Sequence, residues 1–372
     1  MTMPATAPAQ PRCQVSVIIK ALNEERNISE AIESSLAAVA EVGGEVILAD
    51  SHSADRTVEI ACRYPIRVVQ LANPKERCCG IGPQLGYQHA RGEYLYILDG
   101  DMRLVPGFLP VALAFLAQHP EAAGVGGRLV ELNNDSLEYR ERGLRAAAHL
   151  APGEVDRLDG GGLYRRRAIA EAGFFSDRNL HSYEEFDLAV RLRARGWKLW
   201  RLPVRSATHY GHDTPPYRLL MRRWSARYVC GLGELVRGAI GQPHMRLVLR
   251  DMRELRLYSA VLLWWAVLFS VVFWPLSPLA RLGSFALLAV APVAVMTLRK
   301  RSLKRALYSV TSWCLHSAGM VRGLLGRRIS PQRRVASKVL REPPAAPEPG
   351  PRSRHENDLP RGEMGKPSRR DL

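Results

Sequence analysis

The chain has 372 residues, 47% of them hydrophobic, and its formal net charge at pH 7 is +17. This length allows one large domain or two modest ones, each with a buried core. So large a positive charge points to an anionic partner: nucleic acid, anionic lipid or a phosphorylated substrate. The sequence contains no zinc-finger, helix-turn-helix or aromatic RNA-binding motif, so we do not expect nucleic acid as the partner. The basic residues crowd into the second half and flank apolar segments there, which favours a membrane surface.

The six cysteines form no CxxC pair and are not accompanied by a histidine cluster. Disulfide and zinc frameworks are therefore not expected, and a reducing cytosol fits this usage. Residues 1–13 are rich in alanine and proline and lack the apolar core of a signal peptide. We expect them to be disordered and the following domain to stay on the side of synthesis.

Strand-length apolar runs alternate with amphipathic segments in the first third of the chain. The expected strands are residues 14–20, 46–49, 66–71 and 94–98. Helices are expected between them, and this alternation predicts a parallel sheet covered by helices on both faces. After residue 123 the alternation weakens, and we expect one more strand at 125–132 and a helix at 184–195.

The apolar run 94–98 ends in Asp99, Gly100 and Asp101. In open parallel sheets, ligands bind beyond the carboxyl ends of the strands. Two carboxylates this close repel each other unless a cation lies between them, and Mg²⁺ is held by one or two carboxylates together with substrate phosphates. The motif therefore predicts a divalent ion that holds a diphosphate. The alternative is a turn without metal, because Asp and Gly both favour turns.

Three other polar groups follow expected strands or begin a later helix: Asn23 with Glu24, Asp50, and Glu184 with Glu185. Together with the Asp-Gly-Asp turn, their order and spacing resemble those of family 2 glycosyltransferases. The matching segments are 15–24 (opening strand and nucleotide loop), 48–57 (second motif), 90–101 (strand of the DxD acids) and 184–197 (motif of the catalytic base). The resemblance spans roughly residues 14–212.

The resemblance implies the GT-A fold, a Rossmann-like mixed α/β sheet, and an inverting transferase that uses Mg²⁺ or Mn²⁺. Residues implied to bind the nucleotide-sugar donor are Asn23, Glu24, Asp50, Arg77 and Asp99. A metal shell of Asp101, Asp99 and one histidine, His209 or His212, is implied in the same way. The alternatives are a surface histidine in each case and a plain structural loop around Arg77.

On the acceptor side, the resemblance implies that Glu185 is the catalytic base and that Gly161, Gly162, Glu184 and Trp197 contact the acceptor. Glu185 stands where the family usually has Asp, which alters reach but not chemistry, since either carboxylate can take a proton from a hydroxyl. If the acceptor is a lipid phosphate, no base is needed and Glu185 positions the acceptor. The alternatives are helix-start acids stabilised by the helix dipole and a plain glycine turn.

Residues 257–280 carry no charge, and Pro275 and Pro278 separate this run from a second uncharged run at 282–298. A helix over 257–274 is about 27 Å long, close to the hydrocarbon thickness of a bilayer. Basic residues lie outside both runs, so the positive-inside tendency places both outer flanks in the cytoplasm. We expect a membrane hairpin. The alternative is a pair of buried helices in a soluble domain.

A third apolar segment, 306–325, contains His316 and Arg322 and is expected to be interfacial or partly inserted. Upstream of the hairpin, Arg223 and Trp224 resemble half of the QxxRW motif of processive polysaccharide synthases. The glutamine of that motif is absent, so we expect transfer of a single sugar rather than polymerisation.

These segments divide the chain into four expected parts: a disordered N-terminus at 1–13, a GT-A catalytic domain at 14–245, membrane-associated helices at 246–326 and a disordered basic tail at 327–372. The prediction is a multi-pass bacterial inner-membrane enzyme whose catalytic domain faces the cytoplasm. It adds a sugar to a lipid-linked or glycan acceptor in exopolysaccharide, glycolipid or cell-envelope glycan synthesis. The alternatives are a polyprenyl-phosphate sugar synthase, a non-catalytic nucleotide-sugar-binding protein and a membrane scaffold.

Overall fold

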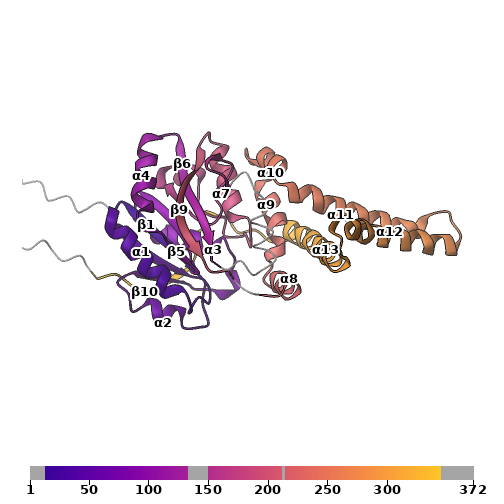
Figure 1. The fold of residues 1–372 in the computed structure, drawn as a ribbon, viewed down its shortest axis with the longest axis horizontal. Coiled ribbons are helices and arrows are strands. Elements are labelled where there is room, and N and C mark those ends of the chain that lie inside the picture. The colour runs from indigo at the N-terminus through magenta and orange to yellow at the C-terminus, as the bar shows by residue number, and fades with distance from the viewer. Residues whose placement is uncertain (1–12, 133–149, 212–213, 345–372) are drawn as a thin grey trace, which may run out of the picture. The chain divides into compact units, whose positions relative to one another are not determined.

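The computed structural model describes residues 13–132, 150–211 and 214–344 (Figure 1). Internal contacts group the described residues up to Glu342 into one compact unit. The expected disordered N-terminus lies outside the described residues except for Cys13, whose carbonyl accepts a hydrogen bond from the backbone of Glu93.

Four parallel strands form the first half of the central sheet. They are β1 (Val15–Ala21), β2 (Gly44–Asp50), β3 (Arg67–Leu71) and β4 (Tyr94–Asp99), arranged in the order β3-β2-β1-β4. The register places Ala21 beside Asp50 and Lys20 beside Asp99. The carboxyl ends of these strands therefore meet at one edge of the sheet, as expected for the strands read from the apolar runs.

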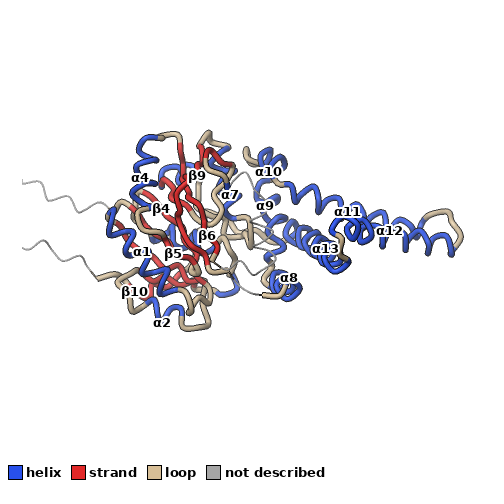
Figure 2. Tube along the Cα trace, viewed as in Figure 1, coloured by secondary structure: helices blue, strands red, loops and turns tan. Residues whose placement is uncertain are grey.

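Helices cover both faces of this half, which explains why its strands are continuously apolar. The helices are α1 (Ile28–Val42), α2 (Thr57–Ala61), α3 (Ile81–His89) and α4 (Phe108–Gln118). Alternate residues of β1 enter two different cores: Val17 and Ile19 pack with α1 and α4, whereas Ile18 packs with α3. Figure 2 shows the red strands of the sheet beside helices α1 and α4.

The second half of the sheet is mixed. It contains β5 (Met102–Leu104), β6 (Ala122–Glu131), β7 (Gly153–Val155), β8 (Gly162–Arg165) and β9 (Lys198–His209). Strand β8 is antiparallel to β4, β6 is parallel to β9, and β5 and β7 are antiparallel to β9. The second half thus combines parallel and antiparallel pairs, whereas the pairs from β3 to β4 are all parallel. The mixed sheet implied by the family resemblance is the one observed.

Helix α7 (Glu184–Arg193) belongs to two hydrophobic cores. Its residues Leu188 and Leu192 pack with α3 and α6 (Arg166–Ala172), whereas Phe186 and Val190 pack with helices from the C-terminal part of the chain. The helix therefore joins the sheet to the C-terminal helices.

The C-terminal part is helical. It contains α8 (Pro216–Ser225), the short turn η3 (Tyr228–Cys230), α9 (Gly231–Ala239), α10 (Met245–Asp251), α11 (Arg253–Ser270), the turn η4 (Val271–Phe273), α12 (Pro278–Lys300) and α13 (Leu303–Leu325). Helix α13 contacts α9, α11 and α12. The interruption between η4 and α12 falls where the prolines were expected to break the helix, and Pro278 begins α12.

Two of these helical segments, Arg253–Phe273 and Pro278–Lys300, are long and apolar enough to cross a membrane. Only 17% and 6% of their most apolar windows are buried inside the chain, which is unlike the helices of a soluble core. The third helix, α13, is not among the candidate spans of the described residues.

The expected disorder of residues 327–372 is wrong for their first part. After α13 the chain returns to the sheet, and β10 (Ser337–Arg341) pairs antiparallel with β3. The sequence predicted disorder here because residues 327–342 show no apolar periodicity. The open edge of β3 supplies the missing partner, since unpaired backbone groups of an edge strand bind another strand whatever its side chains are. Residues 345–372 lie outside the described part of the chain.

Candidate active site

A partly buried lysine links two acids at the sheet edge. Lys20 is the penultimate residue of β1, and its Nζ lies 2.9 Å from Asp99 Oδ1 and 3.3 Å from Glu184 Oε1. Burial acts against its charged form, but Asp99 and Glu184 outweigh this and raise the pKa of Lys20 well above its usual value. Lys20 is therefore a fixed ammonium that holds the end of β4 against the start of α7.

Glu24 packs against the turn that follows β4. A Cβ at Gly100 would lie 2.9 Å from Glu24 Cγ, so only glycine allows this approach. Burial, together with the nearby Asp101, raises the pKa of Glu24 to about 7. Glu24, Asp99 and Asp101 thus form one concentration of negative charge around the predicted motif.

The second aspartate of the motif meets a histidine from β9. Antiparallel pairing of β5 with β9 sets His209 opposite Met102, next to Asp101. His209 Nε2 lies 3.2 Å from Asp101 Oδ2, and its Nδ1 lies 2.5 Å from Glu131 Oε2 at the end of β6. Burial opposes the imidazolium, but these two carboxylates outweigh burial and raise the pKa of His209 to about 10.

These donors suit a divalent cation. Two ligands of one ion, each about 2.1 Å from it, lie roughly 3 Å apart, which is near the 3.2 Å between Asp101 and His209. A carboxylate on the far ring nitrogen is the usual support of a metal-binding histidine, and Glu131 provides it. No group of three or more metal-type side chains is preassembled in the part of the chain that the structure describes. The predicted third ligand, Asp99, is turned to Lys20, and His212 lies outside the described residues.

Asp50 at the end of β2 is fully buried and held by neutral donors. Its carboxylate accepts hydrogen bonds from Ser53 N (3.0 Å), Ser53 Oγ (2.5 Å) and Gln70 Nε2 (2.9 Å). The predicted neighbour Asn23 is exposed, has a φ of 60° and accepts from the backbone N–H of Ala54 at 2.8 Å. The loops after β1 and β2 therefore brace each other through polar contacts.

Arg77 contacts backbone in the described structure. Its Nε donates to the carbonyl of Ser51 at 3.0 Å and its Nη2 to that of His52 at 2.7 Å. These two residues directly follow Asp50, so Arg77 braces the turn beside the predicted donor site. Its expected contact with the donor phosphates stays a prediction.

The acceptor-side predictions bring three segments together. Glu185 Oε1 accepts a hydrogen bond from the backbone N–H of Gly160 at 3.1 Å. Gly161 has a φ of +94°, and a Cβ there would lie 2.4 Å from the carbonyl oxygen of Ile97 in β4. Burial raises the pKa of Glu185 to about 8, with Lys20 opposing. A small cavity beside Glu185 is lined by Lys20 and Glu184 as well.

Trp197 is not brought to this group. Its indole N–H donates to Glu171 Oε2 at 2.8 Å, and the guanidinium of Arg167 lies 5.2 Å from its ring centroid. Both partners belong to α6. Its expected acceptor contact rests on the resemblance alone.

Two residues of the site had no role in the sequence-based prediction. Lys20 was visible at the end of an apolar run, but its carboxylate partners are far away in sequence. Glu131 lies next to the end of the expected strand 125–132 and ends the observed β6, so the rule that acids at strand ends mark the ligand edge could have identified it. Its pairing with His209 depends on the β6–β9 register, which no local pattern shows.

Residues 16–173 match the family model described as Glycosyl transferase family 2. The putative glycosyltransferase EpsE of Bacillus subtilis is 29% identical over 201 residues, which are 51% of this chain and 70% of that protein. Glucomannan 4-beta-mannosyltransferase 2 of Arabidopsis thaliana is 32% identical over 159 residues, or 39% of this chain and 28% of that protein. Dolichol-phosphate mannosyltransferase of Pyrococcus furiosus is 27% identical over 122 residues, 32% of this chain and 34% of that protein.

The chain thus spans about a third or less of the length of two of these relatives. Among solved structures, the mannosyltransferase PcManGT from Pyrobaculum calidifontis, in complex with GDP-Man and Mn²⁺, superimposes with a TM-score of 0.56 at 21% identity. The match covers 85% of this chain and 88% of that one, and it confirms the predicted GT-A fold.

Proposed function

The chain carries a family 2 glycosyltransferase domain at residues 16–173, and on this premise we propose that it is an inverting, metal-dependent glycosyltransferase. It moves a sugar from a nucleoside-diphosphate donor to a membrane-held acceptor. The observation that carries the proposal is the gathering of acids at the sheet edge, where Lys20 pairs with Asp99 and Glu184 and Glu24 lies near Asp99 and Asp101. The relatives supply further support, since those compared are glycosyltransferases by name.

Asp101 and His209 would hold the divalent ion, with Glu131 fixing the imidazole. That ion neutralises the charge of the departing nucleoside diphosphate. The imidazole ligand favours Mn²⁺ over Mg²⁺, because Mg²⁺ takes oxygen ligands. PcManGT, the structural neighbour, was solved with Mn²⁺ and GDP-Man, which supports this choice of metal and of donor class.

Glu185 takes the proton of the acceptor hydroxyl while the acceptor oxygen bonds to the anomeric carbon and the bond to the diphosphate oxygen breaks. Its raised pKa, about 8, makes it a stronger base than an exposed carboxylate. Asn23, Glu24 and Asp50 form the nucleotide side of the site, and Gly161 and Gly162 form its acceptor side.

A second candidate function is a synthase that loads a sugar onto polyprenyl phosphate. The relative named dolichol-phosphate mannosyltransferase favours it. Glu185→Gln separates the two reactions. A hydroxyl acceptor needs the base, so the variant should lose about 10²- to 10⁴-fold in kcat. A phosphate acceptor is already ionised, so the variant should keep most of its turnover.

The main test is a thermal-shift screen of UDP-, GDP-, CDP- and dTDP-sugars against the full chain, with and without Mn²⁺. A ligand present at a hundred times its Kd adds about 2.7 kcal/mol of stability. At least one donor should give a metal-dependent shift that disappears in Asp101→Ala. If none of the donors binds, the remaining interpretation is that the chain is a membrane scaffold. If a donor binds and no hydrolysis or transfer follows with membrane-extract acceptors, the chain is a non-catalytic nucleotide-sugar-binding protein.

The membrane part of the proposal rests on the apolar hairpin. Leu263 in α11 is 67% exposed and Leu287 in α12 is 71% exposed. If the hairpin lies in water, an arginine at either exposed position does not destabilise it. If the hairpin lies in a bilayer, each arginine raises the free energy of membrane insertion by about 2.5–3.5 kcal/mol. We expect Leu263→Arg and Leu287→Arg to release the chain from membranes on carbonate extraction, and Val111→Arg, at an exposed position on α4, to leave it bound.

A further inference from the structure

The C-terminal strap, residues 327–342, is part of the domain core rather than an appendage. Strand β10 extends the sheet at β3, and Val335 is 1% exposed within the core on the α3 face. Gln88 of α3 binds both backbone groups of Val335: its amide donates to the carbonyl at 3.1 Å, and its oxygen accepts from the N–H at 2.7 Å. The strap is therefore held at fixed register across α3.

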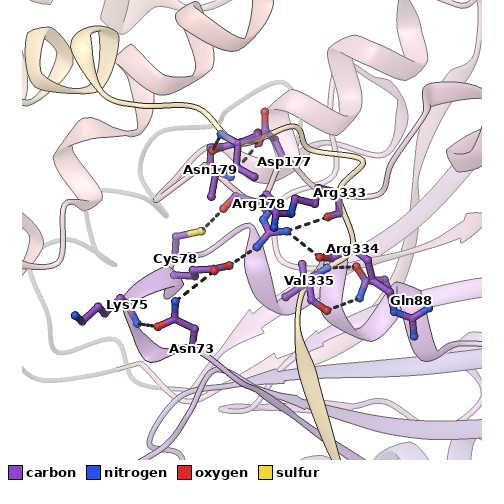
Figure 3. A network of polar contacts seen from close by, with 12 residues as sticks. Asn73, Lys75, Cys78, Gln88, Asp177, Arg178, Asn179, Arg333, Arg334 and Val335 are labelled. Carbon is purple, nitrogen blue, oxygen red and sulfur yellow. Dashed lines mark hydrogen bonds and ion pairs between the residues drawn. The ribbon is translucent and has the colours of Figure 1, made fainter.

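One buried guanidinium joins the strap to a loop beside the candidate active site. The side chain of Arg178 is 4% exposed, and its Nη1 donates to the carbonyls of Arg333 (2.9 Å) and Arg334 (3.1 Å). Its Nη2 pairs with the carboxylate of Glu76 in the short turn η1 (Pro74–Glu76). Figure 3 shows Arg178 between the strap and the loop that carries Asn73, Lys75 and Cys78. A second link follows the same path, since Cys78 Sγ donates to the carbonyl of Arg178 at 3.1 Å.

The next residue carries this link to the turn after β2. Arg77 directly follows Glu76, and its guanidinium holds the carbonyls of Ser51 and His52. His52 has a φ of 68°, a left-handed conformation that nonglycine residues keep only when neighbours impose it. The strap, Arg178, Glu76 and Arg77 thus form one unbroken series of contacts that ends beside Asp50.

We propose that Arg178 is a positioning residue for the donor nucleotide. It clamps the strap to Glu76, so that Arg77 fixes the turn carrying Asp50. The nucleotide part of this inference rests on the proposed function, whereas the mechanical part does not. The guanidinium suits the task because it is always charged and its planar fork donates several hydrogen bonds in fixed directions. A second consequence is that the segment leaving α13 is tied to the donor side of the site.

The test compares three variants of the full chain. Arg178→Gln removes the charge and most of the fork, Arg178→Lys keeps the charge alone, and Arg333→Ala is the matched control. Arg333 contributes only its backbone carbonyl to the clamp, and its side chain is exposed. Hydrogen–deuterium exchange is measured over residues 50–55 and 73–80. Titration calorimetry gives the Kd of UDP, GDP, CDP and dTDP with Mn²⁺.

We expect faster exchange in both segments for Arg178→Gln, an intermediate rate for Arg178→Lys and the wild-type rate for Arg333→Ala. The Kd of the bound nucleotide should rise about 5- to 150-fold in Arg178→Gln, the range of a typical coupling between sites. Glu76→Gln removes the same ion pair at a partly exposed side chain. If Arg178→Gln does not fold, exchange and nucleotide Kd are measured on Glu76→Gln instead, with the same expected changes.

Unchanged exchange at 50–55 would overturn the inference, even if 73–80 becomes more mobile, because Arg178 would then be structural only. Unchanged nucleotide Kd in Arg178→Gln, with both segments loosened, would overturn its donor part. Failure of the wild type to bind any of the four nucleotides, with the exchange pattern as expected, would count against the proposed function and leave the mechanical link standing.

Discussion

The parallel and the mixed halves of the sheet hold their site residues by different means. In the parallel half, Asp50 is buried among neutral donors, the backbone and hydroxyl of Ser53 and the amide of Gln70. In the mixed half, His209 lies between the carboxylates of Asp101 and Glu131. Neutral hydrogen-bond donors fix the shape of the Asp50 site, whereas the row of charges around His209 responds to protons, salt and cations. The first suits a nucleotide and the second a metal.

The largest test of this contrast is Asp101→Asn. The amide keeps the shape but loses the charge, so we expect the kcat/KM of the Mn²⁺-dependent reaction to fall by about 10³-fold or more, equivalent to several kcal/mol of lost charge stabilisation. Nucleoside-diphosphate release at saturating Mn²⁺ measures the effect. Near-normal turnover would place the metal elsewhere.

Asp50→Asn, the same change in the parallel half, should act on affinity instead. Asp50 is fully buried, so the change weakens its hydrogen bonds from Ser53 and Gln70 and loosens the turn beside the donor. Hydrogen bonds to a charged group contribute about 1.5–3 kcal/mol, which corresponds to roughly a 10- to 100-fold rise in the donor KM. We expect kcat to change little. Initial rates at a series of donor concentrations, measured for both Asp→Asn variants, give the effects on kcat and on KM separately. A fall in kcat as large as that of Asp101→Asn would show that the two halves do not differ in this way.

Glu131→Gln removes the charge behind the imidazole. Mutating such a supporting partner lowers metal affinity about 10- to 100-fold, so the Mn²⁺ concentration for half-maximal activity should rise by that factor. The rate at saturating Mn²⁺ should recover. The matched control is Glu154→Gln, a surface acid paired with Lys198. Equal behaviour of the two variants would remove Glu131 from the metal site.

Protons should compete with the metal in the mixed half. The pKa of His209 is about 10 rather than its usual 6.5, so stability from the imidazolium is full below about pH 6.5 and is lost as pH rises through 10. Metal binding needs the neutral ring and should release about one proton at neutral pH. Calorimetry of Mn²⁺ binding in buffers of different ionisation enthalpy counts this proton. Binding that releases none would exclude His209 as a ligand.

The smallest effect is expected on the surface of the parallel half. Glu59 of α2 is fully exposed, and Arg56 lowers its pKa to about 2. Its stabilising effect is present above the usual carboxylate pKa and is lost as pH falls through 2, but solvent screens it. Glu59→Gln should therefore leave both activity and the Tm at neutral pH almost unchanged, in low and in high salt. A large loss of activity in Glu59→Gln would mean that surface charges of the parallel half also contribute to activity.

The sequence predicted the parallel half well because its information is local. Apolar runs mark the strands, and a polar residue after each run lies at the ligand edge, which located Asn23, Asp50 and Asp99. The mixed half depends on pairings between distant segments. Strand β9 contains Pro203 and several charges, so it lacks the apolar pattern of a buried strand. Its pairing with β5 and β6, which assembles Asp101, Glu131 and His209, could not be predicted.

The strap was missed for a related reason. Residues 337–341 become a strand because β3 offers an open edge, and three of these five side chains are exposed. Lys20 illustrates the same limit inside the site: its place after an apolar run was visible, but its ion pair with Glu184 spans 164 positions. Contacts across such separations are set by the assembled fold and not by any neighbouring residues.

Strand β10 also gives the chain an order of assembly. Arg67, which begins β3, and Glu342, which follows β10, are 275 positions apart, so a ribosome adding about 5–20 residues per second finishes β10 tens of seconds after β3. The apolar hairpin is synthesised between them. The sheet therefore stays incomplete until that hairpin has left the ribosome, and a nascent chain that stops before β10 would present an open β3 edge to chaperones and proteases.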